Sequence, residues 1–166
     1  MPEFSDRLAL PFLAAGQAQK EVWHNEALIL LDSLVQTVVK AVAPASVPTT
    51  PMFGECLIVG PTPSGAWAGK AQQIACWTSG GWRFVIPLEG MACWNIAGGV
   101  TVRFSGGAWA IGIVTANELR IGSNKVVGAR LPAISDPTGG ATPDTESRIA
   151  VGAILAAMRT HGLISA

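Results

Sequence analysis

Apolar positions recur at helical spacing near the start of the chain, within residues 16–43. The first row steps alternately by three and four residues through Leu28, Leu31, Val35, Val38 and Val42. This spacing is typical of a coiled-coil seam, and a second apolar row widens the face. Prolines at 44, 48 and 51 then end the pattern. We predict a long N-terminal helix that packs either on other copies of the chain or on its own β domain.

The middle of the chain, residues 52–130, changes to short runs of β-branched and aromatic residues separated by glycine-rich turns. Six runs recur: GECLIVG, QQIACW, WRFVIP, MACWNI, VTVRF and WAIGIV. Short strands joined by tight turns favour an antiparallel meander. We expect this meander to close into a small barrel or sandwich.

The last segment begins with the turn sequence SDPTGG and continues into a second helical pattern. Thr142 fits the N-cap and Pro143 the first helical position. The helix is expected to run to about His161 and to stop at Gly162. Its body, IAVGAILAAM, is apolar nearly all the way round, which favours burial between subunits. The residues expected at that interface are Ile149, Ile154, Leu155 and Met158.

These segments together predict an α+β chain. Its expected elements are a long N-terminal helix, a small antiparallel β barrel or sandwich, and a C-terminal apolar helix. Residues 1–50 form the expected attachment and oligomerisation segment, residues 51–130 the β domain, and residues 131–166 a turn with an oligomerisation helix.

The composition is rich in apolar residues and poor in charged ones, so much apolar surface must be covered. Of the 166 residues, 49% are hydrophobic and 13% charged, and 11 basic side chains balance 11 acidic ones. A neutral, charge-poor surface offers no electrostatic footprint for nucleic acid and little protection against self-association. We therefore expect a homo-oligomer without nucleic-acid partners. A trimer is favoured because the seam has no buried Asn, and a pentamer is the alternative.

Targeting and cysteine patterns indicate a chain made in the cytoplasm. Apolar runs fall short of transmembrane length, and the sequence start lacks the basic region of a signal peptide. No membrane insertion is expected. The three cysteines, Cys56, Cys76 and Cys93, lie in apolar runs without CxxC spacing. We predict that they are reduced, buried thiols.

Catalytic and metal-binding patterns are missing from the sequence. His24 and His161 have no cluster of further ligands around them, so neither a metal nor another cofactor is expected. Nucleophile elbows, phosphate-binding loops and dinucleotide fingerprints do not occur. Glu55 and Glu89 are candidate carboxyls for a glycosidase, but nothing in the sequence brings them together. We expect no enzymatic activity.

Tryptophans supply the alternative function. Three tryptophans each close a glycine-rich turn motif: Trp67 ends SGAW, Trp82 ends SGGW and Trp109 ends SGGAW. There they are candidates to stack against sugar rings, since a flat apolar face suits a pyranose. The competing interpretation is that they fill the core of the β domain.

Most of the chain resembles a known family, including the closing AISDPTGGATPDTESRIAVGAILAAMRTHGLI, which is similar to C-terminal helices that often end its members. The opening LPFLAAGQAQKEVWHNEALILLDSLVQ and the block FGECLIVGPTPSGAWAGKAQQIACWTSGGWRFVIPLEGMACW look like a family of unknown function. That family occurs in tail-fibre and head-spike proteins of phages and gene transfer agents. The resemblance implies a virion component that attaches to the particle and contributes to host-surface adhesion, often to capsular polysaccharide. It supplies no catalytic residues.

We therefore expect a self-assembling virion structural protein: a head-spike, tail-fibre or decoration subunit bound to other virion proteins. The polar segment with Gln17, Gln19 and Lys20 is a candidate docking tip for such a protein. A carbohydrate-binding module that recognises capsular polysaccharide is the alternative.

Overall fold

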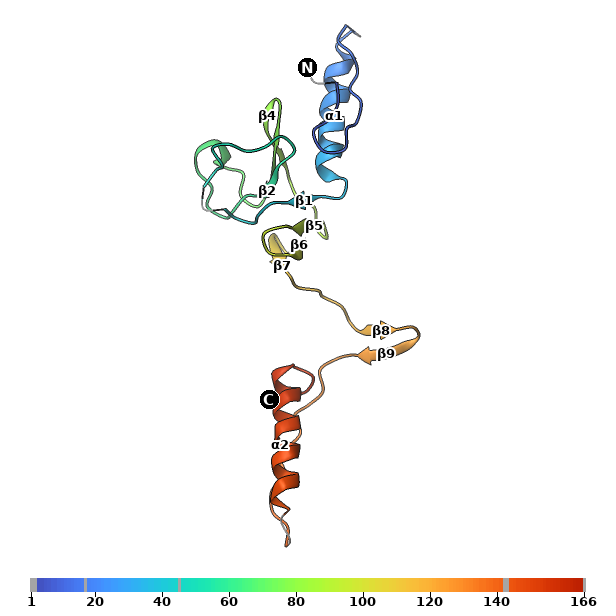
Figure 1. The fold of residues 1–166 in the computed structure, drawn as a ribbon, viewed down its shortest axis with the longest axis vertical. Helices are drawn as coiled ribbons and strands as arrows, with labels where there is room; N and C mark the ends of the chain where they lie inside the picture. The colour runs from blue at the N-terminus through green and yellow to red at the C-terminus, as the bar shows by residue number, and fades with distance from the viewer. Residues whose placement is uncertain (1–2, 17, 45, 142–143, 166) are drawn as a thin grey trace. The chain divides into compact units, whose positions relative to one another are not determined.

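The computed structural model describes residues 3–16, 18–44, 46–141 and 144–165 (Figure 1). The chain divides into two compact units, Met1–Ile113 and Val114–Ala166. The first unit contains one α-helix, a short 3-10 helix and seven strands among its described residues. Their bounds are α1 Lys20–Leu34, β1 Val38–Val39, β2 Cys56–Ile58, η1 Gly65–Trp67, β3 Ile74–Thr78, β4 Gly81–Val85, β5 Ala92–Asn95, β6 Val100–Ser105 and β7 Ala108–Ile111.

The strands of the first unit form two small sheets joined by one segment. β2, β3 and β4 make an antiparallel sheet, and the other has the order β1-β5-β6-β7, with β1 parallel to β5. Residues 37–43 bond to both: the Trp94 N–H donates to Thr37 O (3.0 Å), and the Lys40 N–H donates to Cys56 O (2.8 Å). The segment after α1 therefore ties the two sheets together.

Two buried clusters hold these sheets. One combines side chains from both sheets: Val39, Cys56, Ile58, Ile74, Cys76, Val85, Cys93 and Val102. The second lies on the other face of β2 and β3 and consists of Leu57, Val59, Trp67 and Ala75. Neighbouring positions on β2 and β3 alternate between the two clusters, so both faces of these strands are buried, as their continuous apolar sequence requires.

The predicted closed barrel or sandwich is wrong. Each of the six predicted runs contains a strand, but the strands form an open arrangement, and β4 and β7 are not paired with each other in the part of the chain that the structure describes. Pro87 follows β4 and lacks the N–H that a continuing ladder needs. The chain leaves the first sheet there, and β5 pairs with β1 and β6 instead.

The predicted long N-terminal helix is also wrong, because α1 covers only 15 residues. At its end, Gln36 has a left-handed φ of 45°. The Thr37 hydroxyl lies within hydrogen-bonding distance of Ser33 O (3.2 Å) and Leu34 O (2.9 Å), carbonyls of the last turn. The β-branched residues that follow prefer a strand, and Val38 pairs with Trp94 of β5.

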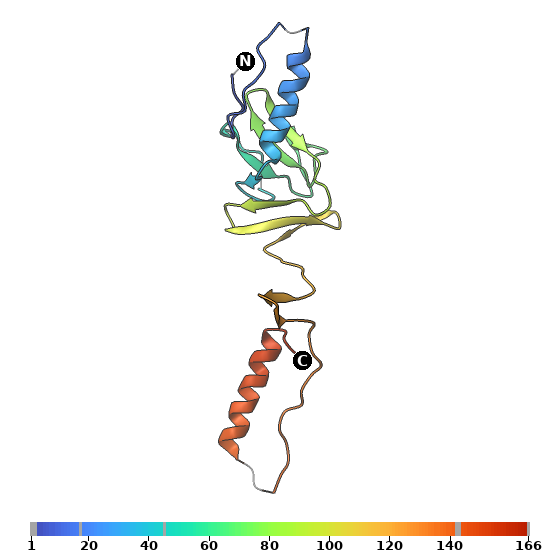
Figure 2. The same ribbon diagram turned by 90° about the vertical axis from the view of Figure 1, so that its right-hand side faces the viewer.

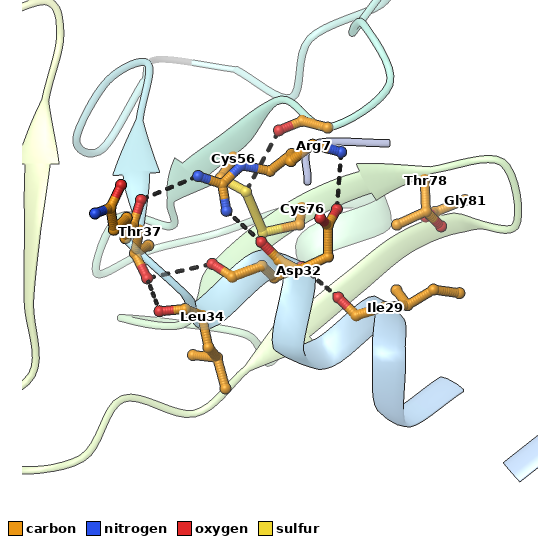
Figure 3. Close-up of a disulfide and its surroundings, with 12 residues drawn as sticks. Arg7, Ile29, Asp32, Leu34, Thr37, Cys56, Cys76, Thr78 and Gly81 are labelled. Atoms are coloured by element: carbon orange, nitrogen blue, oxygen red, sulfur yellow. Dashed lines mark hydrogen bonds between the residues drawn. A yellow bond between two sulfur atoms is a disulfide. The ribbon is translucent and has the colours of Figure 1, made fainter. Parts of the chain in front are cut away.

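The prediction of three free thiols is wrong for two cysteines. Cys56 and Cys76 form a disulfide across β2 and β3 (Figure 3), and Cys93 is a buried free cysteine. Cys56 lies directly opposite Cys76 in the register. The next pair along the ladder is hydrogen-bonded, with the Trp77 N–H donating to Glu55 O (2.9 Å). The cysteines therefore occupy a non-hydrogen-bonded pair, the position where side chains of antiparallel strands approach closest.

The second unit contains a hairpin and a helix: β8 Leu119–Ile121, β9 Asn124–Val127 and α2 Thr145–Thr160. Asp144 caps α2 by accepting from the Ser147 N–H (2.9 Å), whereas the predicted N-cap, Thr142, and Pro143 lie outside the described residues. The helix ends at Thr160 with His161 as its C-cap, and Gly162, where the sequence predicted the stop, has a φ of 71°. Leu131 pairs with Ile164 and holds the chain end beside the preceding segment.

Candidate functional site

An N-terminal strap, residues 3–16, runs alongside α1 (Figure 2). The strap closes on itself, since the Ser5 N–H donates to Leu10 O (2.9 Å) and the Phe12 N–H to Glu3 O (2.8 Å). Two buried polar side chains of α1, Asn25 and Asp32, attach it to the helix. They are seven residues apart, about two helical turns, and so share one face of α1.

Asn25 holds the C-terminal part of the strap, at Leu13. Its side chain is 1% exposed, and both ends of the amide are used. Oδ1 accepts from the Leu13 N–H (2.9 Å), and Nδ2 donates to Leu13 O (3.1 Å). The amide therefore pairs with the strap backbone in the way a neighbouring strand does, and its burial leaves no polar atom unpaired.

Asp32 holds the middle of the strap, at Arg7 and Leu8 (Figure 3). Its carboxylate, 4% exposed, accepts from the Arg7 N–H (2.9 Å) and from the Leu8 N–H (2.6 Å). The Arg7 guanidinium also donates to the Asp32 backbone carbonyl and to Gln36 O (3.0 Å). Burial, together with the nearby Asp32 charge, raises the pKa of Asp6 in the same strap.

A third polar residue of α1 reaches the sheet. Glu26 accepts from Arg83 of β4 through both carboxylate oxygens, at 2.8 and 3.1 Å. These hydrogen bonds lower the pKa of Glu26 and raise that of Arg83. The paired geometry fixes the rotation of α1 about its axis, because a guanidinium held at two points defines a direction.

The opposite side of α1 is apolar and uncovered in one copy. Side chains three and four residues apart form a stripe, which we call the outer stripe: Trp23, Ala27, Leu30, Leu31 and Leu34. Trp23 is 80% exposed, Leu31 50%, Leu30 41% and Leu34 37%. Surface helices usually direct their apolar stripe inward and their polar side outward. α1 instead exposes an apolar stripe while it buries Asn25 and Asp32, which makes the outer stripe a candidate contact surface.

The second unit has little core of its own. In its described residues the buried apolar side chains are Leu155 (6% exposed) and Ile164 (0%). Exposed large apolar side chains occur on the hairpin, the connecting segments and α2: Val114, Leu119, Ile121, Val126, Val127, Leu131, Ile134, Ile149, Val151, Ile154 and Leu163. A lone two-stranded hairpin is marginal in water, and a 16-residue helix depends on packing. This unit needs apolar cover from elsewhere.

The structure divides the predicted N-terminal seam. Leu31 and Val35 lie at the exposed surface, and Leu28 is half-buried. Val38 belongs to β1, and Val42 packs against the cluster between the sheets. The seam therefore ends with the helix; Val38 contributes to strand pairing, and Val42 packs against the core of the first unit.

The predicted interface residues of α2 also separate. Ile149 and Ile154 are 67% and 59% exposed. Leu155 is buried, and Met158 is half-buried.

Of the predicted docking segment, Gln17 lies outside the described residues. Gln19, with a left-handed φ of 66°, is exposed and precedes Lys20, the exposed first residue of α1. These docking assignments stay predictions.

The three tryptophans predicted to contact a glycan take part in packing. Trp67 is 3% exposed and meets the edge of Trp82, with 5.2 Å between ring centroids. Trp82 also meets Trp77 at 5.1 Å. Trp109 is half-buried, and its Nε1–H donates to Gln72 O (2.9 Å). Carbohydrate binding stays an untested alternative that gains no support from these three rings.

A pocket beside Glu55 was not anticipated from the sequence. It has a volume of about 430 Å³, and we call it the Glu55 pocket; its lining is Arg7, Val38, Lys40, Met52, Phe53, Gly54, Glu55, Cys56 and Ile96. The Glu55 side chain is 5% exposed, and Oε2 accepts from Lys40 Nζ (3.0 Å). Its Oε1 is buried and has no hydrogen-bond partner among the described residues. A charged residue directly before the buried run CLIV was the available signal.

The two carboxyls considered for a glycosidase have different surroundings. Glu55 pairs with Lys40, whereas Glu89 accepts from the Ser105 hydroxyl (2.6 Å) and the Gly106 N–H (3.0 Å) at the turn between β6 and β7. These hydrogen bonds lower the pKa of Glu89. Glu89 therefore acts as a turn-stabilising acceptor, and no described contact joins it to Glu55.

The described residues form neither a metal site nor a membrane span. No group of three or more His, Cys, Asp or Glu side chains is arranged to hold a metal ion in these segments. Neither described helix has the length and apolarity needed to cross a bilayer.

A protein-family model covers the core of the first unit. The model, described as a protein of unknown function (DUF2793), matches residues 24–110, just over half of the 166 residues. The match begins within α1 and extends into β7, so it includes both sheets and most of the outer stripe. No curated protein matches the sequence.

Proposed function

The chain belongs to the DUF2793 family of proteins of unknown function, and from this premise we propose that it is a non-enzymatic structural protein of a virion. It is a head-spike, tail-fibre or decoration subunit of a phage or gene transfer agent that self-assembles, binds other virion proteins and contributes to host-surface adhesion. The virion role rests on the likeness of the opening sequence to such proteins. Self-assembly rests on the outer stripe.

The outer stripe carries the self-assembly proposal because α1 cannot turn it inward. Rotation of the helix would break the hydrogen bonds of Asn25, Asp32 and Glu26. The exposed fractions of the stripe amount to roughly two fully exposed large side chains. Covering them stabilises an assembly by about 3–6 kcal/mol per chain before the cost of association, at about 1.5–3 kcal/mol for each buried side chain.

The second unit supports the same proposal independently. Its described residues bury two large apolar side chains and expose many. Sister copies supply the missing cover most simply, because each brings an identical apolar surface. A cyclic assembly covers every copy equally. A trimer stays the favoured form and a pentamer the alternative.

Analytical ultracentrifugation of the full chain at micromolar concentration tests self-assembly. We expect a defined oligomer. The variant Leu31→Glu places a charge within the outer stripe and should weaken the assembly, whereas Thr49→Glu adds the same charge at an exposed loop position and should not. A monomer at all concentrations, or equal effects of the two variants, contradicts the role of the stripe.

The virion role needs a separate experiment. Purified particles from cells that express the chain are analysed by quantitative mass spectrometry and by labelling with a specific antibody. We expect the protein in a fixed ratio to the particle's major protein. Particles that lack it would contradict a virion role even if the purified chain assembles.

A further inference from the structure

The Glu55 pocket combines an apolar rim with an unsatisfied acceptor. Met52, Phe53 and Ile96 at its edge are 70%, 62% and 59% exposed. Glu55 Oε1 is buried without a hydrogen-bond partner among the described residues, whereas buried polar atoms normally have one. The pocket therefore fits a group with an apolar body and an N–H or O–H donor.

The chain itself carries such a group. It contains no tyrosine, so tryptophan is its aromatic side chain with both a large apolar body and a strong donor. Among the described tryptophans, Trp23 is 80% exposed and Trp94 is 47% exposed. Trp94 is already half covered by its own sheet, whereas Trp23 is the most exposed member of the outer stripe.

Trp23 and the Glu55 pocket lie at opposite ends of α1 in one copy. Trp23 belongs to the first helical turn, whereas Val38 and Lys40 of the pocket follow the last turn. The helix between Trp23 and Leu34 is about 16 Å long at 1.5 Å per residue, too far for one side chain to bridge. A contact between this indole and the pocket therefore requires two copies of the chain.

We infer that Trp23 is the anchor of self-assembly and enters the Glu55 pocket of a neighbouring copy. Its Nε1–H donates to Glu55 Oε1, and its ring packs against Met52 and Phe53. The volume of about 430 Å³ lies within the range of pockets that hold molecules larger than an indole. This inference rests on the proposed self-assembly and names its central contact.

The contact joins different surfaces of the two copies. A head-to-tail contact of this kind produces a ring when the rotation between neighbours closes. Such a ring agrees with the favoured trimer and with the pentamer. Tryptophan is also enriched among the few residues that dominate binding energy at interfaces.

Sedimentation of three single variants of the full chain tests the contact. Trp23→Ala should raise the dissociation constant of the assembly by about 30-fold or more, the effect of removing an interface hot spot. Trp23→Phe retains an aromatic ring without the donor and should have an intermediate effect. Trp94→Ala is the matched control and should leave the dissociation constant unchanged. Thermal melting of each variant separates assembly from folding.

Photo-crosslinking identifies the partner surface directly. A benzophenone amino acid replaces Trp23, or Trp94 as control, and isotope-labelled and unlabelled chains are mixed before illumination. We expect mixed-isotope adducts from position 23 to residues 52–55 or to Ile96. If wild-type protein is monomeric, both this inference and the proposed self-assembly fail. If it assembles but Trp23→Ala has no effect, or the adducts map elsewhere, only this inference fails.

Discussion

Opening the Cys56–Cys76 disulfide should lower the free energy of unfolding of the first unit by about 3 kcal/mol. The bond joins residues 20 positions apart, and loop-closure entropy for that separation corresponds to about 3 kcal/mol at 25 °C. The effect acts mainly on the unfolded chain, which regains conformations that the closed loop excludes. Because both cysteines lie in the cluster between the sheets, the folded unit should retain its packing after reduction.

Urea unfolding followed by tryptophan fluorescence measures this effect, because Trp67, Trp77 and Trp82 lie in the first unit. With a typical urea dependence, a loss of about 3 kcal/mol lowers the unfolding midpoint by roughly 1–3 M after reduction. The double variant Cys56→Ala/Cys76→Ala is the control, since added reductant should not change its midpoint. This comparison separates the disulfide from other effects of the reductant.

Thiol titration of the denatured chain completes the experiment. The unreduced protein should show one thiol, Cys93, and the reduced protein three. An unchanged midpoint together with that rise from one to three would refute the loop-entropy reasoning. Three thiols before reduction would refute the disulfide itself.

Three further predictions concern single side chains. Asp32→Ala should cost about 3 kcal/mol, because it removes a buried carboxylate that accepts from two strap amides; hydrogen exchange of those amides should accelerate, and unchanged protection would contradict the attachment. Hydrogen bonds from Arg83 lower the pKa of Glu26, so this pair stabilises the fold above the unfolded-state pKa of Glu26, and the stabilisation is lost as pH falls below about 4.5. Glu26→Gln should abolish that part of the pH dependence of the free energy of unfolding. A variant with the same acid profile as the wild type would refute this prediction. Burial raises the pKa of Cys93 to about 11, so iodoacetamide at pH 8 should alkylate it slowly in the folded chain and quickly in urea; equal rates would show that the thiol is accessible.

Local signals in the sequence located the strands well. Runs such as QQIACW and VTVRF combine β-branched or aromatic residues with flanking turn residues, and each contains a strand. Their pairing was not predictable in the same way, because register and neighbours depend on contacts far apart in sequence. The parallel pairing of Val38 with Trp94 and the opposition of Cys56 to Cys76 are both of this kind.

The helical pattern of α1 was recognised from the sequence. The residue at which the helix ends and the side of the helix that is buried were not predictable from that pattern. Periodicity shows that apolar side chains share a stripe, and the usual assumption is that the stripe faces the chain's own core. Here the buried side chains of Asn25 and Asp32 accept from backbone N–H groups of the strap, so this polar side of the helix faces inward. Val38 and Val42 continue the spacing by coincidence, because strand pairing decides their conformation.

The polar attachment of α1 uncouples two tasks that most helices perform with a single face. Hydrogen bonds to the strap and to β4 keep the helix in position, so the folded subunit does not depend on burial of the outer stripe for its stability. The side chains of the outer stripe therefore remain exposed to solvent in the folded subunit. In the proposed assembly, substitutions in the outer stripe would therefore change how strongly copies bind each other while each subunit keeps its fold.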